Sequence, residues 1–279
     1  MGASHTPTRA MFTQYPHLRL LGVFELFSVA LLALIWTAYG RTGRSDRIAG
    51  TAGAGAVLLI GMALLATSSY VVAALTPFPL FDGALSAADH ALGFDWSAWT
   101  AAIERHPAVQ HVLDASYNAM LPELVGAVLY LGFCREARSL LTSLIVAGLI
   151  TVCVSGLVPA IGNLPNAPHV PALLALRAGK VLDGFPQGLV SFPSYHAAVA
   201  ILLTIALRRH AWLFRVACVI NGLMVISTLS TGGHYLVDVL AGAGVAWISH
   251  RIAERDPRNR IREVQEASES QSPNEVLAL

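Results

Sequence analysis

Long apolar runs separated by short polar stretches occupy most of the chain. A helix needs about 20 apolar residues to cross the hydrocarbon core of a bilayer, and several segments reach or approach that length. The pattern therefore predicts an all-α fold, a polytopic integral membrane helical bundle with about seven transmembrane helices. The predicted spans cover residues 20–39, 54–75, 116–133, 140–161, 192–208, 211–230 and 234–250.

The fifth of these spans is the weakest. Its fully apolar part runs only from Ala197 to Leu207, and Arg208 and Arg209 follow directly. Arginine side chains at a helix end reach toward the membrane surface. We therefore expect the other end of this helix to begin in a cavity below the opposite surface.

Composition agrees with a membrane protein and excludes other classes. Of the 279 residues, 55% are hydrophobic and 13% are charged, whereas soluble domains carry about 25% charged residues. A formal net charge of +1 leaves no basic field to bind nucleic acid. The three cysteines lie in or beside apolar runs without paired spacing, which is typical of inert small hydrophobes. No segment indicates a protein partner, so the lipid bilayer is the expected surrounding.

The basic residues predict the orientation of the chain. Thirteen of the 18 lie in the short loops and the tail on one side, if the loop at 40–49 is cytoplasmic. Cytoplasmic loops carry such an excess, so the N-terminus is expected outside and the C-terminus in the cytoplasm. All but Lys180 of the basic residues are arginine. This usage and the short loops are typical of bacteria, which predicts the inner membrane with a periplasmic outer face.

Two long stretches are expected on the outer face. Residues 76–115 have a partial helical period and carry Trp96 and Trp99, which favours an amphipathic segment lying at the membrane interface. Residues 162–191 are rich in Pro and Gly, and loops of this length are often functional. We divide the chain into an N-terminal tail with two accessory helices (1–75), a membrane domain carrying the candidate chemistry (76–250) and a mobile cytoplasmic tail (251–279).

Ionisable residues at the outer ends of spans are the candidates for chemistry. His234 and Asp238 are four residues apart, so they share one face of a helix, and a carboxylate there fixes the tautomer of the imidazole. Gly232 and Gly233 precede them and would let the backbone approach an anion at a helix N-terminus. The alternative is a capped helix with a local His–Asp hydrogen bond.

A second histidine begins the fifth span. Pro193 and Ser194 are typical of a helix start, with Ser194 as the N-cap, and His196 would lie in the first turn. By itself this pattern also fits a structural interfacial histidine. However, His196 and His234 fall on the same side of the membrane, and the loop before His196 carries Arg177 and Lys180. We expect these elements to form one site.

These residues resemble a known family. The segment Pro193-Ser194-Tyr195-His196 resembles the Pro-Ser-Gly-His motif of the type 2 phosphatidic acid phosphatase superfamily, and Ser227 to Asp238 resembles its Ser-Arg-x5-His-x3-Asp motif. The sequence of these two segments is most similar to the branch that contains inositol phosphorylceramide synthases (inositolphosphotransferases) and their bacterial relatives. Three departures are visible: Thr228 replaces the motif arginine, Tyr195 replaces the glycine, and the first motif, Lys-x6-Arg-Pro, is absent.

The resemblance implies an acid-phosphatase-like core and a division of roles. His234 would be the nucleophile that forms a phosphohistidine, Asp238 would orient it, and His196 would be the general acid. It implies a membrane lipid with a phosphate head group as substrate, water or an alcohol as acceptor, and no metal or other cofactor. From charge and position we add a phosphate-binding set of Ser194, Gly233, Arg177 and Lys180.

Other readings stay open at this point. Two imidazoles and one carboxylate (His196, His234 and Asp238) are also a ligand set for Fe(II) or Zn²⁺. Glu25 and Glu123 inside spans are typical of transporters or proton-coupled channels, although Glu123 would equally pair with a buried polar group. A third alternative is a pseudoenzyme that binds lipid phosphates without turnover. It stays open because Thr228 replaces the motif arginine.

Overall fold

A computed structural model describes residues 16–164, 167, 169–180 and 190–256, with the side chains of 16–25 and 169 excepted. The N-terminal tail, residues 181–189 and the tail after 256 lie outside the described residues, as does the side chain of Glu25. Every regular element in the described part is a helix, which confirms the all-α prediction.

Each predicted span falls on one helix. The seven are α2 (Pro16–Thr42), α3 (Asp46–Leu75), α6 (Pro107–Phe133), α7 (Ala137–Leu157), α9 (Tyr195–Ala206), α10 (Ala211–Ser230) and α11 (Leu236–Glu254). Of these, α3, α7, α10 and α11 are long and apolar enough to cross a membrane. Large apolar side chains such as Leu64, Val219 and Trp247 are more than 60% exposed on the outside of the bundle. Such a surface belongs in lipid, so the protein is embedded in a membrane.

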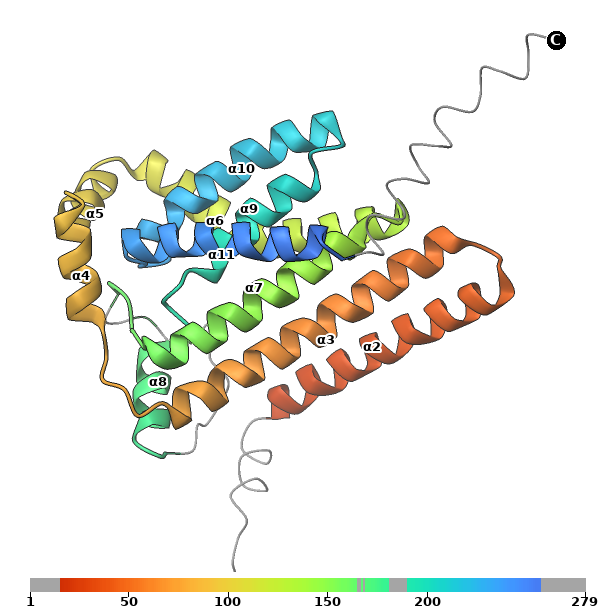
Figure 1. The fold of residues 1–279 in the computed structure, drawn as a ribbon, viewed down its shortest axis with the longest axis horizontal. Helices are drawn as coiled ribbons and strands as arrows, with labels where there is room; N and C mark the ends of the chain where they lie inside the picture. Colours follow the sequence, from red (N-terminus) through yellow and green to blue (C-terminus); the bar gives the residue numbers. More distant parts are fainter. Residues whose placement is uncertain (1–15, 165–166, 168, 181–189, 257–279) are drawn as a thin grey trace, which may run out of the picture.

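The short helix α9 lies at the centre of the bundle (Figure 1). Four successive residues of this helix, 197–200, have no exposed surface, and they pack among side chains of α6, α7, α10 and α11. Its 12 residues cover only about 18 Å, well short of the roughly 30 Å of a hydrocarbon core. Ser194 and Ala197, at its beginning, have no exposed surface, so the start of α9 lies inside the bundle.

Glycines permit the close helix contacts that place this start. A Cβ at Gly242 of α11 would lie 2.3 Å from the carbonyl oxygen of Ser194 and 3.2 Å from Cβ of Ala197. A similar contact joins α3 and α6, where a Cβ at Gly50 would lie 2.6 Å from the oxygen of Gly132. Small residues at such crossings let helix backbones approach within membranes.

The segment at 76–115 differs from its prediction. It forms two short helices, α4 (Asp82–Ala91) and α5 (Trp96–Glu104), and α6 begins at Pro107, nine residues before the predicted span. Proline at the first helical position has its φ preset and lacks only an N–H that would be unpaired, which explains the early start. Figure 1 shows α4 and α5 across one end of the long helices. The indole Nε1 of Trp96 donates to the carbonyl of Leu229 (2.6 Å), so the segment is tied to the bundle.

Candidate active site

His234 and Asp238 meet in the turn between α10 and α11. Gly233 has φ +64°, which reverses the chain after α10, and the backbone N–H of His234 donates to the carbonyl of Thr228 (2.9 Å). Asp238 lies in the first turn of α11, with its Oδ2 3.3 Å from Nδ1 of His234. A carboxylate partner places the proton on Nδ1, so Nε2 of His234 carries the lone pair.

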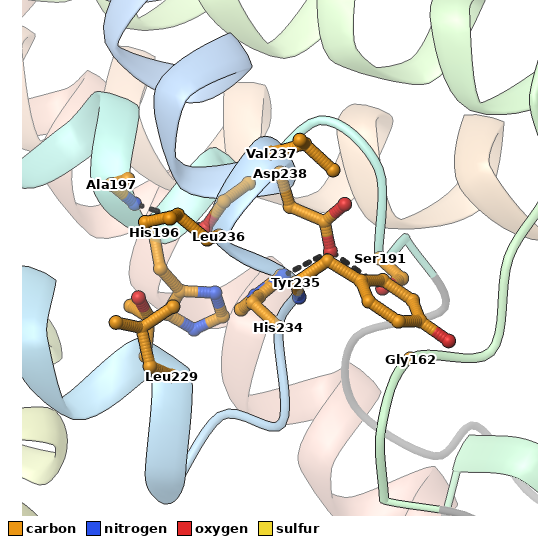
Figure 2. Close-up of polar contacts among 12 residues, drawn as sticks. Gly162, Ser191, His196, Ala197, Leu229, His234, Tyr235, Leu236, Val237 and Asp238 are labelled. Atoms are coloured by element: carbon orange, nitrogen blue, oxygen red, sulfur yellow. Dashed lines mark hydrogen bonds and ion pairs between the residues drawn. The ribbon is translucent and has the colours of Figure 1, made fainter. Parts of the chain in front are cut away.

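The carboxylate of Asp238 is fully buried and held by two further donors. Its Oδ2 also accepts the backbone N–H of Tyr235 (3.0 Å) and the hydroxyl of Ser191 (3.3 Å). Asp238 has no exposed surface, and its Oδ1 has no hydrogen-bond partner among the described residues. Because three donors converge on Oδ2, this oxygen is fixed where it faces the imidazole of His234 (Figure 2).

His196 approaches the same point from α9. Ser194 is the N-cap of this helix, as predicted, and its Oγ accepts the N–H of Ala197 (3.3 Å). The N–H of Ser194 donates to the backbone carbonyl of Asp238 (3.0 Å), which joins the start of α9 to α11. The ring centroids of His196 and His234 are 6.0 Å apart with their planes inclined by 58°. Figure 2 shows the two imidazoles next to each other.

Tyr117 is a neighbour of His196 that the sequence did not single out as a site residue. Its hydroxyl lies 3.3 Å from Nε2 of His196, and the two rings are stacked with centroids 5.0 Å apart. Its ring also packs against Gly232, where an added Cβ would lie 3.0 Å from Cε2. The signal in the sequence was a tyrosine at the polar end of the third span, but periodicity does not say which helix it faces.

Two residues expected to bind phosphate have scaffold roles in this structure. Ser194 has no exposed surface, and its hydroxyl oxygen is used as the cap. At Gly233, a Cβ would lie 2.5 Å from Cγ of Leu164, and its carbonyl accepts the N–H of Asn163 (2.7 Å). The glycine is therefore required by its positive φ and by the protein's own packing.

The two cations of the loop lie apart from the histidines. A guanidinium nitrogen of Arg177, at the end of α8 (His169–Arg177), donates to the carbonyl of Phe78. Its Nη1 is buried without a partner among the described residues and is an available donor. Lys180 follows α8 and is exposed. Within the part of the chain that the structure describes, neither side chain contacts His196 or His234.

Two polar residues of the bundle are explained by internal pairing. Thr228, where the motif has arginine, has no exposed surface, and its hydroxyl donates to the carbonyl of Val225 (2.7 Å). It therefore supplies no charge to the site. The carboxylate of Glu123 on α6 accepts a hydrogen bond from the side-chain amide of Asn221 on α10 (2.8 Å). Of the two alternatives for Glu123, this contact is the pairing with a buried polar group.

Two aspartates of α4 hold the site from outside, and sequence reasoning missed both. The oxygens of Asp89 accept the backbone N–H groups of Leu236 (2.8 Å) and Val237 (2.9 Å). Asp82 accepts the N–H groups of Ile161 and Gly162 and the hydroxyl of Tyr235 (3.1 Å). The signal was their seven-residue spacing, which places both on one helix face.

The side chains present do not form a metal centre of the kind considered from the sequence. Among the described residues, no three His, Cys, Asp or Glu side chains are grouped so that they could hold a metal ion. In particular, the Oδ2 of Asp238 already accepts three hydrogen bonds, one of them from Nδ1 of His234.

The fold and the paired histidines define a helical membrane protein with a buried His–His–Asp site. A model of the PAP2 superfamily matches residues 83–252, more than half of the chain, and the protein belongs to this superfamily. The match covers nearly all of α4 to α11 and, apart from Asp82, the residues around His234 described above. No curated protein and no solved structure matches the chain. Membership together with the apolar helices makes it a membrane enzyme of the phosphatase type.

Proposed function

We propose that this protein transfers the phosphoryl group of a membrane lipid phosphate or phosphodiester through a phosphohistidine on His234. The observation that carries the proposal is the convergence of two imidazoles whose ring centroids are 6.0 Å apart. Asp238 contacts Nδ1 of one of them, His234. Phosphoryl transfer needs an in-line nucleophile and a protonated leaving oxygen, and two histidines so placed supply both.

In the first step, the lone pair on Nε2 of His234 attacks phosphorus while the bond from phosphorus to the leaving oxygen breaks. Protonated His196 gives its proton to that oxygen. The Nδ1–H of His234 keeps its hydrogen bond to Oδ2 of Asp238. The negative charge of this carboxylate offsets the positive charge of the phosphorylated ring. A general acid of this kind is worth about 10²–10⁴ in rate.

In the second step, neutral His196 takes a proton from water or from an alcohol. The oxygen so activated attacks phosphorus, the P–N bond breaks, and its electron pair returns to Nε2 of His234. With water as acceptor the protein is a lipid phosphatase. With an alcohol as acceptor it is a phosphotransferase, which is the chemistry that the likeness to the inositolphosphotransferase branch favours.

The phosphate oxygens need donors beside the histidines. At the start of α9 the N–H groups of Ser194 and Ala197 are already bonded within the protein, so the amides offered there are those of Tyr195 and His196. They lie at a helix N-terminus, where anions are favoured. The unpartnered Nη1 of Arg177 is a second candidate, and Lys180 a third. Within this proposal the amides are the primary phosphate-binding groups and the two cations assist.

We further propose that the site faces the outside of the membrane, with the C-terminus in the cytoplasm, as the arginine distribution predicts. In bacteria this is the periplasmic face of the inner membrane. The start of α9 lies inside the bundle, so a lipid would present its phosphate there while its acyl chains remain among the helices.

The test uses the purified full-length protein in detergent with a chelator present. Lipid phosphates and phosphodiesters are supplied with and without inositol, ethanolamine or glycerol, and both free phosphate and new phospholipids are measured. We expect turnover that vanadate inhibits and that His234→Ala reduces by about 10³-fold or more. Activity retained in His234→Ala would refute the nucleophile, and loss with chelator alone would favour a metal enzyme.

A further inference from the structure

We propose that Asp89 is a positioning residue for His234: by capping α11 from α4, its carboxylate sets the place of the imidazole in the site. The inference rests on the proposed function in its kinetic part. It makes α4 part of the reaction apparatus, where the sequence predicted only an interfacial segment.

The cap is made across the fold. The first amides of a helix have no partner within it and are usually satisfied by the N-cap side chain. At α11 the N-cap is Tyr235, whose hydroxyl is directed to Asp82. The amides of Leu236 and Val237 are instead satisfied by the two oxygens of Asp89, 147 and 148 residues away in sequence.

Asp89 is built for this contact. Only 3% of the residue is exposed, so the carboxylate is removed from water, and both of its oxygens accept a backbone N–H. Such bonds to an ionised group are stronger than neutral ones, and a negative charge is favoured at a helix N-terminus. Asp82, seven residues earlier on α4, holds the adjoining chain at Ile161 and Gly162.

The contact controls His234 because of where it acts. Leu236 and Val237 lie between His234 and Asp238, so the amides that Asp89 holds are on the segment that joins the two. Removing the carboxylate leaves two partly buried N–H groups without their acceptors, and α11 relieves this by shifting or fraying at its first turn. A shift of about 1 Å in such a position can lower the rate about 100-fold.

The same contact explains why phosphate is not expected at the start of α11. Its first amides are occupied by a carboxylate, which would repel an anion. Gly232 and His234 also donate their N–H groups to carbonyls of residues 227 and 228. At the start of α9 the N–H groups of Ser194 and Ala197 are also taken, which leaves those of Tyr195 and His196 as the helix N-terminal amides for phosphate beside the histidines.

The variants for the test are Asp89→Ala, Asp89→Asn and, as a matched control, Asp95→Ala. Asp95 is also a capping aspartate of the same outer segment, but it caps its own helix through Ser97 and Ala98. Loss of a cap as such is common to both positions, whereas only Asp89 holds α11. Gel filtration and circular dichroism of each full-length variant in detergent check that it folds.

The first readout needs no turnover. Diethyl pyrocarbonate modifies accessible imidazoles, and mass spectrometry gives its rate at His234, which is only 4% exposed. We expect about fivefold faster modification in Asp89→Ala than in Asp95→Ala, with Asp89→Asn between, because asparagine retains one acceptor oxygen. Equal rates at His234 in Asp89→Ala, Asp95→Ala and the unchanged protein would overturn the proposal.

The second readout separates positioning from substrate binding. With dioleoyl phosphatidic acid in mixed micelles, we expect kcat about 10 to 100 times lower in Asp89→Ala, KM within about twofold, and partial recovery in Asp89→Asn. A raised KM with unchanged kcat would contradict a positioning role. If the unchanged protein turns over none of the lipids supplied, the proposed function fails, and the modification rates still decide whether Asp89 positions His234.

Discussion

At the scale of single residues, the site consists of one imidazole with a carboxylate at its Nδ1 and a second imidazole beside it. Asp238 is fully buried, and its Oδ2 lies 3.3 Å from Nδ1 of His234. Tyr117 contacts Nε2 of His196 at 3.3 Å. Each contact fixes the position of one ring nitrogen, and each is removable by a substitution that keeps the shape of the side chain.

Asp238→Asn removes the negative charge that fixes the tautomer of His234 and offsets its positive charge during the reaction. We expect kcat to fall by about 10³-fold or more with the fold retained, as measured by lipid phosphate turnover and by circular dichroism. Asp46→Asn is the control, because the pair of Asp46 with Arg135 is exposed and contributes little. Comparable losses in both variants would contradict a specific role for Asp238.

Tyr117→Phe removes the hydroxyl at His196 and keeps the stacked ring. If the hydroxyl helps to hold His196 as general acid, kcat should fall about tenfold for a lipid phosphate, whose leaving oxygen needs a proton. It should change little for p-nitrophenyl phosphate, which has a good leaving group. Tyr130→Phe is the matched control, because the Tyr130 hydroxyl lies 3.1 Å from Nδ1 of His210, near the other end of α6. An equal loss with both substrates would argue against this role.

At the scale of elements, the site is assembled by helix starts that meet. The start of α9 brings His196, the start of α11 brings Asp238, and α4 caps α11 from outside through Asp89. The backbone bond from Ser194 to the carbonyl of Asp238 and the close approach at Gly242 hold α9 against α11. The spacing of the two histidines is therefore a property of this crossing.

Gly242→Ala tests the crossing directly. The added methyl group would lie 2.3 Å from the carbonyl oxygen of Ser194, so α9 must move away and His196 with it. We expect turnover about tenfold lower and a loss of about 1–3 kcal/mol in unfolding free energy. Gly244→Ala on the same helix meets nothing within 4 Å, and should be neutral or stabilising by up to about 1 kcal/mol. Unchanged turnover in Gly242→Ala would show that the crossing does not set the site.

At the scale of the whole molecule, the apolar exterior and the layout of charges place the protein in a membrane with one proposed orientation. The short helix α9 and the segment with α4 and α5 define the end of the bundle that holds the histidines. The direction in which this end faces decides whether substrate comes from outside the cell or from the cytoplasm.

Single cysteines test that direction. In a background with Cys134, Cys153 and Cys218 replaced by serine, Gly83→Cys lies on exposed α4 and Arg44→Cys in the exposed turn between α2 and α3. We expect a membrane-impermeant maleimide to label Gly83→Cys in intact spheroplasts, and Arg44→Cys only after permeabilisation. The reverse pattern would place the active site in the cytoplasm.

The sequence by itself determined the fold class, the place of each span and the identity of the histidine pair. Apolar period and length are local properties, because each helix satisfies its own backbone in lipid. For this reason each of the seven predicted spans falls on one helix, although the helix ends differ, and Ser194 was recognisable as a cap. The motifs around His196 and His234 were recognisable for the same reason, since their residues are neighbours along the chain.

Only the tertiary structure decided which distant groups reach these residues. Asp89 and Tyr117 act across 147 and 79 residues of sequence, and no periodicity links such positions. Packing likewise gave Ser194 and Gly233 structural contacts that the sequence did not show, and directed Arg177 to a backbone carbonyl. Contacts between helices depend on which small residues allow two backbones to approach. That is a property of the assembled bundle, which no single segment contains.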